Sequence, residues 1–193
     1  MLLANFKTAA RKKAKTVRAK AHREMSYVSS QAVCNHINNF VINEKHFKVI
    51  AVYMPIQTEI DILPVIPRIR ELGKILCLPN IISDNEPLDF LAWNENSKLV
   101  KGKFGVMVPE TDKIVDPDLI LCPMLSFDAR GYRLGYGGGF YDRTIHHLAS
   151  QKSIFTLGCA FSEQISLGTL PIGKYDKPLN AVVTENGVTF FDI

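Results

Sequence analysis

Hydrophobic residues near the start of the chain recur at steps of three and four positions, which is the spacing of one face of an α-helix. This apolar face is predicted to pack against the core, so the segment would be part of the fold. A second helix is predicted over residues 30–41. The first face comprises Leu3, Phe6, Ala10, Ala14, Val17 and Ala21.

The rest of the chain alternates between short apolar runs and helix-like stretches. The runs are partly β-branched, as is typical of strands buried in a sheet. Helices are predicted over residues 61–72 and 140–150. Alternating strands and helices indicate an α/β domain whose sheet is mainly parallel and covered on both faces. The predicted strands are residues 47–54, 75–81, 88–93, 119–125, 154–161 and 181–184.

Prolines stand at the ends of three of these predicted strands, at Pro55, Pro79 and Pro123. In open parallel sheets, ligand sites are usually built at the carboxyl ends of the strands. We therefore expect functional residues close to these positions.

Length and composition restrict the class of protein. The chain has 193 residues, of which 47% are hydrophobic and 22% are charged, so we expect one globular domain over residues 1–193. No apolar run is long enough to cross a bilayer, and the start of the chain lacks an apolar stretch followed by a small-residue cleavage site. A soluble, cytoplasmic protein without membrane contact is expected.

The net charge of +4 is unevenly distributed, because residues 1–25 carry eight Lys and Arg residues and one acidic residue. Such a segment suits a nucleic-acid arm, an organelle transit peptide, or a helix whose cations meet a small anion. Composition alone does not distinguish these. Lys7, Arg11, Lys15 and Arg18 recur on one helical stripe, so their cations could converge on one anion. The alternative is a solvated basic face.

A glycine-rich segment follows the predicted strand at 119–125. Glycine occupies four of five positions, at 135 and 137–139, which is entropically costly unless the chain needs positive φ angles or lies against a ligand. A loop of this kind before a predicted helix forms an anion site from backbone N–H groups and the helix dipole. Arg133 and Arg143 would add donors at its rim. Neither the dinucleotide fingerprint nor the Walker pattern fits, and a glycine-rich surface turn is the alternative.

The segment RLGYGGGFYDR (133–143) resembles the signature of the 5-formyltetrahydrofolate cyclo-ligase family, with Phe140 replacing the first of two paired aromatic residues. This resemblance implies a three-layer α/β/α sandwich like that of sugar-phosphate isomerases and CoA transferases. It extends over nearly the whole chain. The other matching segments are YMPIQTEID (53–61), FGVMVPE (104–110), DLILCPMLSFDARGYRLG (118–135), AFSEQ (160–164), LPIGKYD (170–176) and AVVTENG (181–187).

The resemblance implies that the protein uses ATP and Mg²⁺ to convert 5-formyltetrahydrofolate to 5,10-methenyltetrahydrofolate, with release of ADP and phosphate. ATP would phosphorylate the formyl oxygen, and nitrogen 10 of the folate would then attack the activated carbon. The positions matched to ATP binding are Lys7, Arg11, Arg133, Leu134, Gly135, Tyr136, Gly137, Gly138, Gly139, Phe140 and Tyr141.

The same resemblance assigns the remaining roles. Asp142 and Asp176 match magnesium ligands, although Asp142 could instead only complement the helix dipole. Phe104 could stack on the pterin or belong to the core. Catalytic roles fall on Arg133, Tyr141 and Asp142, and folate-binding roles fall on Met54, Glu59, Phe104, Tyr136, Gly137, Gly138, Gly139 and Phe140. Ordinary surface charge is expected for Lys12, Lys13, Lys15 and Arg18.

Two rival functions follow from the residues themselves. A phosphosugar isomerase or transferase of similar architecture would also use a phosphate site, but without ATP. A nucleic-acid binder would use the basic first helix, but the apolar face should bury that helix and no nucleic-acid motif is present. The resemblance implies 5-formyltetrahydrofolate and ATP as partners, and no nucleic acid is expected. A monomer is expected, with a dimer as the alternative.

Overall fold

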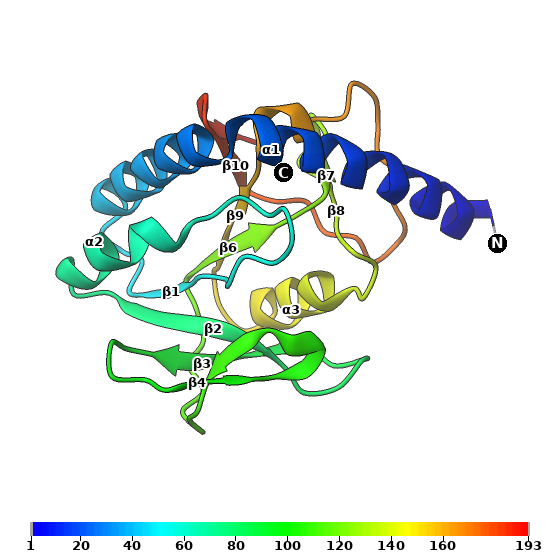
Figure 1. Ribbon diagram of the computed structural model, residues 1–193. Helices are drawn as coiled ribbons and strands as arrows, with labels where there is room; N and C mark the ends of the chain where they lie inside the picture. The colour runs from blue at the N-terminus through cyan, green and yellow to red at the C-terminus, as the bar shows by residue number, and fades with distance from the viewer. Residues whose placement is uncertain (1, 193) are drawn as a thin grey trace.

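The computed structural model describes residues 2–192, and its centre is a seven-stranded sheet with the order β11-β10-β9-β6-β1-β2-β3 (Figure 1). Neighbours from β10 to β2 pair in parallel, and the edge strands β3 and β11 pair antiparallel. The mainly parallel sheet is thus confirmed. The strands are β1 (Val49–Ala51), β2 (Ile75–Ile81), β3 (Leu88–Trp93), β6 (Leu119–Pro123), β9 (Phe155–Cys159), β10 (Ala181–Thr184) and β11 (Gly187–Phe190).

Helices cover both faces of this sheet. The α-helices are α1 (Leu2–Asn43), α2 (Ile66–Glu71) and α3 (Phe140–Ala149). Successive strand residues point to opposite faces, so Leu121 packs in the core that contains residues of α1 and α2, whereas Cys122 packs in the core that contains Leu148 of α3. Figure 1 shows α1 and α3 on opposite sides of β6 and β9. The fold is a three-layer α/β/α sandwich.

The two helices predicted in the first 43 residues are one continuous helix of 42 residues. Residues 2–43 contain neither glycine nor proline, so the backbone has no strong helix breaker. Ser30, at the predicted start of the second helix, is buried in this helix, and its Oγ accepts a hydrogen bond of 3.2 Å from the backbone N–H of Asp61. The serine therefore anchors a neighbouring segment and does not begin a new helix.

The face of α1 that packs on the protein differs from the predicted apolar face at its N-terminal end. Leu3 and Phe6 are 41% and 61% exposed, whereas Ala14 and Ala21 are buried. Arg18 is 1% exposed, so its assignment to ordinary surface charge was wrong. The reason is that the stripe carrying Lys7, Arg11 and Arg18 turns towards the body of the protein, where polar groups receive the cations. Lys12, Lys13 and Lys15 are exposed, as expected.

The remaining elements are short and connect the layers. The predicted helix at 61–72 is shorter than expected, because the Oδ1 of Asp61 accepts a hydrogen bond from the N–H of Leu63 and a 3-10 turn precedes α2. Within residues 2–192, no helix combines the length and apolarity needed to span a bilayer. These short elements are β4 (Leu99–Lys101), β5 (Met107–Pro109), β7 (Ser126–Phe127), β8 (Arg133–Leu134), and the 3-10 helices η1 (Leu63–Val65), η2 (Lys103–Gly105) and η3 (Ser162–Gln164).

Candidate active site

A cavity of about 570 Å³ opens at the carboxyl ends of the central strands β1, β2 and β6. Tyr53 follows β1, Pro79 lies in the second half of β2, and Pro123 ends β6, and all three line the cavity. The expectation from the strand-end prolines therefore holds for Pro79 and Pro123, but Pro55 is not part of the lining. A cavity of this volume suits small-molecule ligands.

Every residue that the resemblance implied for the site lines this one cavity. Segments far apart in the sequence supply them: the start of α1, the loop after β1, the turn between β4 and β5, the glycine loop with α3, and the loop before β10. Their roles remain predictions, but their shared location is a property of the fold. They are Lys7, Arg11, Met54, Glu59, Phe104, Arg133, Leu134, Gly135, Tyr136, Gly137, Gly138, Gly139, Phe140, Tyr141, Asp142 and Asp176.

The glycine loop connects β8 to α3 and has backbone angles that require glycine. Gly137 has a φ of 113°, and Gly139, the N-cap of α3, has a φ of 70°, a region that other residues rarely adopt. The Nε of Arg11 donates a 3.0 Å hydrogen bond to the carbonyl of Gly135. A methyl group on Gly137 would lie 3.1 Å from the guanidinium carbon of Arg11. Arg11 of α1 thus lies directly on the loop.

Arg143 was expected to add a donor at the rim of the cavity, but its side chain points elsewhere. Its Nη2 donates hydrogen bonds of 2.9 Å to the carbonyls of Asp84 and Gly138, and its Nε donates to the carbonyl of Glu86. It lies outside the cavity lining. The reason is its position one residue after Asp142 on α3, which directs its side chain towards the loop between β2 and β3. Arg143 thus holds the glycine loop through the carbonyl of Gly138, from outside the cavity.

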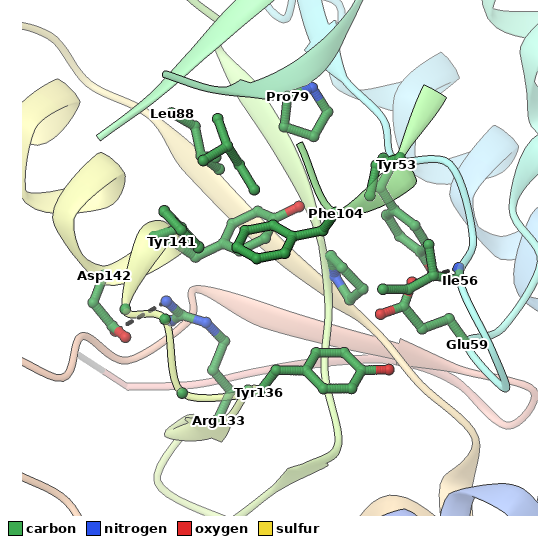
Figure 2. Close-up of a pocket in the computed structure, with 18 of the residues that line it drawn as sticks. Tyr53, Ile56, Glu59, Pro79, Leu88, Phe104, Arg133, Tyr136, Tyr141 and Asp142 are labelled. Carbon is green, nitrogen blue, oxygen red and sulfur yellow. Dashed lines mark hydrogen bonds and ion pairs between the residues drawn. The ribbon is translucent and has the colours of Figure 1, made fainter. Parts of the chain in front are cut away.

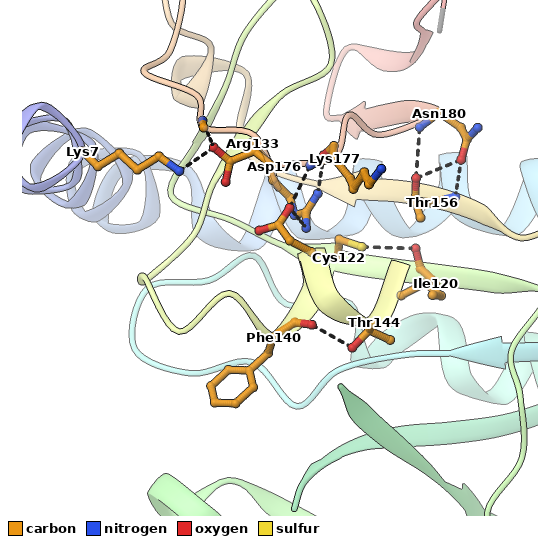
Figure 3. Close-up of polar contacts among 12 residues, drawn as sticks. Lys7, Ile120, Cys122, Arg133, Phe140, Thr144, Thr156, Asp176, Lys177 and Asn180 are labelled. Carbon is orange, nitrogen blue, oxygen red and sulfur yellow. Dashed lines mark hydrogen bonds and ion pairs between the residues drawn. The ribbon is translucent and has the colours of Figure 1, made fainter. Parts of the chain in front are cut away.

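Two pairs of opposite charges stand side by side at one end of the cavity (Figure 3). Lys7 forms an ion pair with Asp176, whose Oδ2 also accepts a hydrogen bond of 2.5 Å from the N–H of Gly173. Arg133 donates from Nη2 to the Oδ1 of Asp142 at 2.9 Å, and the same oxygen accepts from the N–H of Lys177 at 3.0 Å. The cations therefore have fixed positions before any anion binds.

The two carboxylates of this cluster suit a hard divalent cation held together with phosphates. Mg²⁺ in nucleotide sites usually takes one or two carboxylates, with the remaining ligands from phosphate and water. Each aspartate uses one carboxylate oxygen in the contacts above. Among residues 2–192, no cluster of three or more His, Cys, Asp or Glu side chains has metal-binding geometry. Asp142 and Asp176 thus fit a metal shared with a phosphate ligand, and do not form an all-protein site.

Glu59 lies on the other side of the cavity from Asp142 (Figure 2). The glutamate is 5% exposed, and its Oε2 accepts a hydrogen bond of 3.0 Å from the N–H of Ile56. Burial raises the pKa of Glu59 to about 7, although that hydrogen bond and the nearby Arg18 cation lower it. A carboxylate with this pKa changes its charge near neutral pH, as groups at functional sites often do.

Aromatic and apolar side chains line the cavity together with Glu59. Phe104 is 74% exposed and has a left-handed φ of 54°, so it is not a core residue, which was one of its two interpretations. Its ring centroid lies 6.5 Å from that of Phe140. Met54 is partly buried and packs against the main core while it lines the cavity. This part of the cavity offers flat, apolar surfaces beside one acid.

Several lining residues were not predicted. Tyr53 and Leu88 belong to apolar runs that the sequence marks only as strands. Gln57 has a left-handed φ of 54°, which no sequence pattern revealed. Lys103 lies next to Phe104, and its charge carried no signal of its own. The unpredicted lining residues are Tyr53, Ile56, Gln57, Asn80, Ile81, Leu88, Lys103, Val106 and Val108.

Comparison with known proteins gives consistent matches. The model of the 5-formyltetrahydrofolate cyclo-ligase family matches residues 4–185. The 5-formyltetrahydrofolate cyclo-ligase of Escherichia coli is 34% identical over 148 residues, which cover 72% of this chain and 79% of that protein. A probable 5-formyltetrahydrofolate cyclo-ligase of Caenorhabditis elegans is 29% identical, with 92% of each chain covered.

Solved structures agree at the level of the fold. The 5,10-methenyltetrahydrofolate synthetase of Aquifex aeolicus superimposes with a TM-score of 0.75 at 28% identity, and the match covers 100% of this chain and 94% of that one. The 5,10-methenyltetrahydrofolate synthetase of Mycoplasma pneumoniae gives a TM-score of 0.72 at 23% identity, with 93% and 98% covered. The three-layer arrangement is therefore shared along nearly the full length of these chains.

Proposed function

Because the chain belongs to the 5-formyltetrahydrofolate cyclo-ligase family, we propose that it converts 5-formyltetrahydrofolate to 5,10-methenyltetrahydrofolate with ATP and Mg²⁺. The observation that carries the proposal is that one cavity has two chemically different ends. Lys7, Arg11 and the glycine loop form an end rich in cations and N–H groups, Glu59 forms an acidic end on the other side, and Phe104 lies between them (Figure 2). A triphosphate and a flat heterocycle thus find complementary groups in the same cavity.

The chemistry requires both ligands, because the oxygen of the formyl amide is a poor leaving group at neutral pH. In the proposed reaction, the γ-phosphoryl group of ATP is transferred to the formyl oxygen and ADP is released. Nitrogen 10 then attacks the formyl carbon, the carbon–oxygen bond breaks, and phosphate leaves as nitrogen 10 loses its proton. The protein has to align the reactants and neutralise phosphate charge.

The phosphate end supplies charge and backbone donors. Lys7 and Arg11 project from α1, and the loop before α3 offers N–H groups at a helix N-terminus. Asp142 and Asp176 would hold Mg²⁺, which neutralises charge on bound phosphates. Arg133 keeps Asp142 in place through a 2.9 Å hydrogen bond. Burial raises the pKa of Tyr141 well above its usual range, so the phenol stays protonated and acts as a hydrogen-bond donor.

The folate end supplies orientation. The Glu59 carboxylate can accept two hydrogen bonds from adjacent N–H groups of a pterin, which is a strong, charge-assisted arrangement. Phe104 presents an exposed ring for stacking, and Met54 packs along the edge of the ligand. These contacts would place the formyl group between Glu59 and the glycine loop.

The proposal is tested with purified protein, 5-formyltetrahydrofolate, ATP and Mg²⁺, by following the absorbance of the methenyl product. Product should form only when both nucleotide and divalent cation are present. Undiminished product formation without ATP, or in excess EDTA, would contradict the proposed reaction.

The pKa of Glu59 makes a separate prediction about pH. The carboxylate form accepts the two pterin hydrogen bonds, and Glu59 ionises at about pH 7 in the folded protein. The KM for 5-formyltetrahydrofolate should therefore fall by about tenfold between pH 6 and pH 8. Over this range the ionised fraction of a carboxyl group with a pKa of about 7 rises from about one tenth to about nine tenths. Measurements at saturating ATP give this profile.

The control for this profile is Glu59→Gln, which cannot ionise. Its KM should be higher and nearly independent of pH in the same range. An identical pH profile in the wild type and in Glu59→Gln would show that another group is responsible. The free energy of unfolding, measured against pH, checks the direction of this pKa shift. Because the folded-state pKa is raised above the ordinary value of 4.5 to about 7, the free energy of unfolding should fall as pH rises from about 4.5 through about 7, and Glu59→Gln should remove that fall.

A further inference from the structure

Arg18 is the most deeply buried charged side chain among the residues that the structure describes, and the proposed reaction assigns it no part. It is 1% exposed, although it belongs to a helix segment whose other cations lie at the surface or in the cavity. A buried guanidinium is costly unless it is paired and hydrogen-bonded. Its partners therefore indicate what it does.

The guanidinium of Arg18 reaches three separate segments. Its Nε donates a 3.1 Å hydrogen bond to the Oγ1 of Thr58, and its Nη1 donates one of 3.1 Å to the carbonyl of Met124. Its Nη2 donates to the hydroxyl of Tyr136, and the guanidinium carbon also lies 5.3 Å from the centroid of the Tyr136 ring. The Nη1 forms an ion pair of 3.7 Å with the Oε1 of Glu59.

Two of these segments carry opposite ends of the cavity. Thr58 and Glu59 belong to the loop after β1, and Tyr136 belongs to the glycine loop. The hydroxyl of Tyr136 also lies 3.4 Å from the Oε1 of Gln57, and Figure 2 shows it directed towards the Glu59 side of the cavity. Gln57 has a left-handed φ of 54°, a conformation that persists in a residue other than glycine only when its surroundings enforce it.

We propose that Arg18 is a positioning residue that fixes the Glu59 carboxylate and the Tyr136 side chain for the folate ring, and so ties the loop after β1 to the glycine loop. Arg18 does not line the cavity, so it acts on the ligand only through Glu59 and Tyr136. The identity of the ligand as folate rests on the proposed function. The link between Arg18 and Glu59 does not.

The charges around Glu59 indicate how the link can be measured. The groups that face it are Arg18 from α1, Tyr53 after β1, Tyr136 from the glycine loop and Tyr141 from α3. The pKa values of the three tyrosines are raised by burial, so these side chains are neutral near pH 7. Of the four groups, Arg18 is the one whose charge favours the ionised form of Glu59.

The test is an NMR titration of full-length protein labelled with ¹³C at the glutamate carboxyl groups, combined with binding of 5-formyltetrahydrofolate. In Arg18→Met, the pKa of Glu59 should rise by about one pH unit or more, because a nearby cation typically lowers a carboxyl pKa by that amount. The Kd for 5-formyltetrahydrofolate at pH 7 should increase by about fivefold or more, because a rise of one unit from a pKa of about 7 lowers the carboxylate fraction from about one half to about one tenth. Arg18→Lys should return the pKa most of the way, because it restores the cation.

Two controls separate positioning from general damage. Lys13→Met removes an exposed cation from the same helix and should change neither the Glu59 titration nor the Kd. Arg18→Met combined with Glu59→Gln avoids an unpaired buried charge, so it should fold even if Arg18→Met is unstable. In the Glu59→Gln background, Arg18→Met should weaken binding by less than it does in the wild type, because one of the two positioned groups is already neutral.

An unchanged Glu59 pKa in Arg18→Met, or an equal loss of affinity in both backgrounds, would overturn the inference. The two proposals fail separately. If the wild type makes no methenyl product but its Glu59 pKa responds to Arg18→Met, the proposed function is wrong and the positioning role stands. If product forms and the pKa of Glu59 does not respond, the positioning role is wrong and the proposed function stands.

Discussion

Asp142→Asn should lower turnover by at least about a hundredfold at saturating substrates while the protein remains folded. Asparagine keeps the shape of the side chain and an oxygen that can accept from Arg133 and from the N–H of Lys177, as Asp142 does at 2.9 and 3.0 Å. It removes the negative charge that a magnesium ion needs. Charge stabilisation by a metal is worth several kcal/mol in a transition state, whereas weakened contacts to Arg133 should change stability by only about 1–2 kcal/mol.

Turnover against magnesium concentration, together with a melting curve, decides between the two roles of Asp142. Loss of turnover with a small change in Tm supports a metal ligand. If Asp142 only complements the dipole of α3, the substitution should cost a little stability and leave turnover almost intact at saturating magnesium. Asp112→Asn, at an exposed position outside the cavity, is the matched control and should behave as wild type. Near-normal activity with unaltered magnesium dependence would exclude Asp142 from the metal site.

Lys7→Ala should raise the KM for ATP by about ten- to a hundredfold, which corresponds to the loss of roughly 1.5–3 kcal/mol from one charge-assisted contact. The side chain is 19% exposed and is already held by Asp176, so it loses little further conformational freedom when phosphate binds. Its removal also leaves Asp176 without its cation beside the phosphates. Both effects weaken nucleotide binding, and neither should affect the KM for folate strongly.

Steady-state kinetics with ATP varied at fixed magnesium and saturating folate measure this effect. Lys13→Ala is the control, because Lys13 is an exposed cation on the same helix and should leave the KM for ATP unchanged. Equal ATP kinetics in Lys7→Ala and the wild type would mean that Lys7 only stabilises the loop that carries Asp176.

The sequence predicted the central sheet because its strands are buried on both faces. Residues 75–81, 88–93 and 181–184 form apolar runs with clear limits, and the strands β2, β3 and β10 have these same bounds. The strands β4, β5, β7, β8 and β11 were not predicted. They are two to four residues long, and they pair as hairpins or at a sheet edge, so burial imposes little pattern on them.

The first helix shows where local pattern is insufficient. A period of three to four residues established that the segment is helical, but two stripes competed for the buried face. The structure buries Ala14, Arg18 and Ala21 and exposes Phe6. Hydrophobicity alone ranks phenylalanine above arginine for the interior. The buried position of Arg18 depends on partners that are distant in the sequence. They are the hydroxyl groups of Thr58 and Tyr136, the carbonyl of Met124 and the carboxylate of Glu59.

The candidate site was easier to predict than this helix face, because its residues carry constraints that are visible locally. Positive φ angles explain two of the four glycines in the loop, Gly137 and Gly139, and the family resemblance supplied distant members such as Glu59. Gln57 had no such signal, because a strained backbone in a residue other than glycine leaves no mark on composition. Lys103 and Val106 line the cavity through the β4–β5 turn, whose position depends on tertiary contacts.

The most direct measurement of the central claim follows the formyl oxygen itself. The substrate is 5-formyltetrahydrofolate carrying ¹⁸O in the formyl group, incubated with the purified protein, ATP and Mg²⁺, and the inorganic phosphate is examined by ³¹P NMR or mass spectrometry. Transfer of phosphoryl to that oxygen predicts one ¹⁸O atom in each phosphate released, in step with methenyl product. Methenyl product accompanied by unlabelled phosphate would contradict phosphorylation of the formyl oxygen at this site.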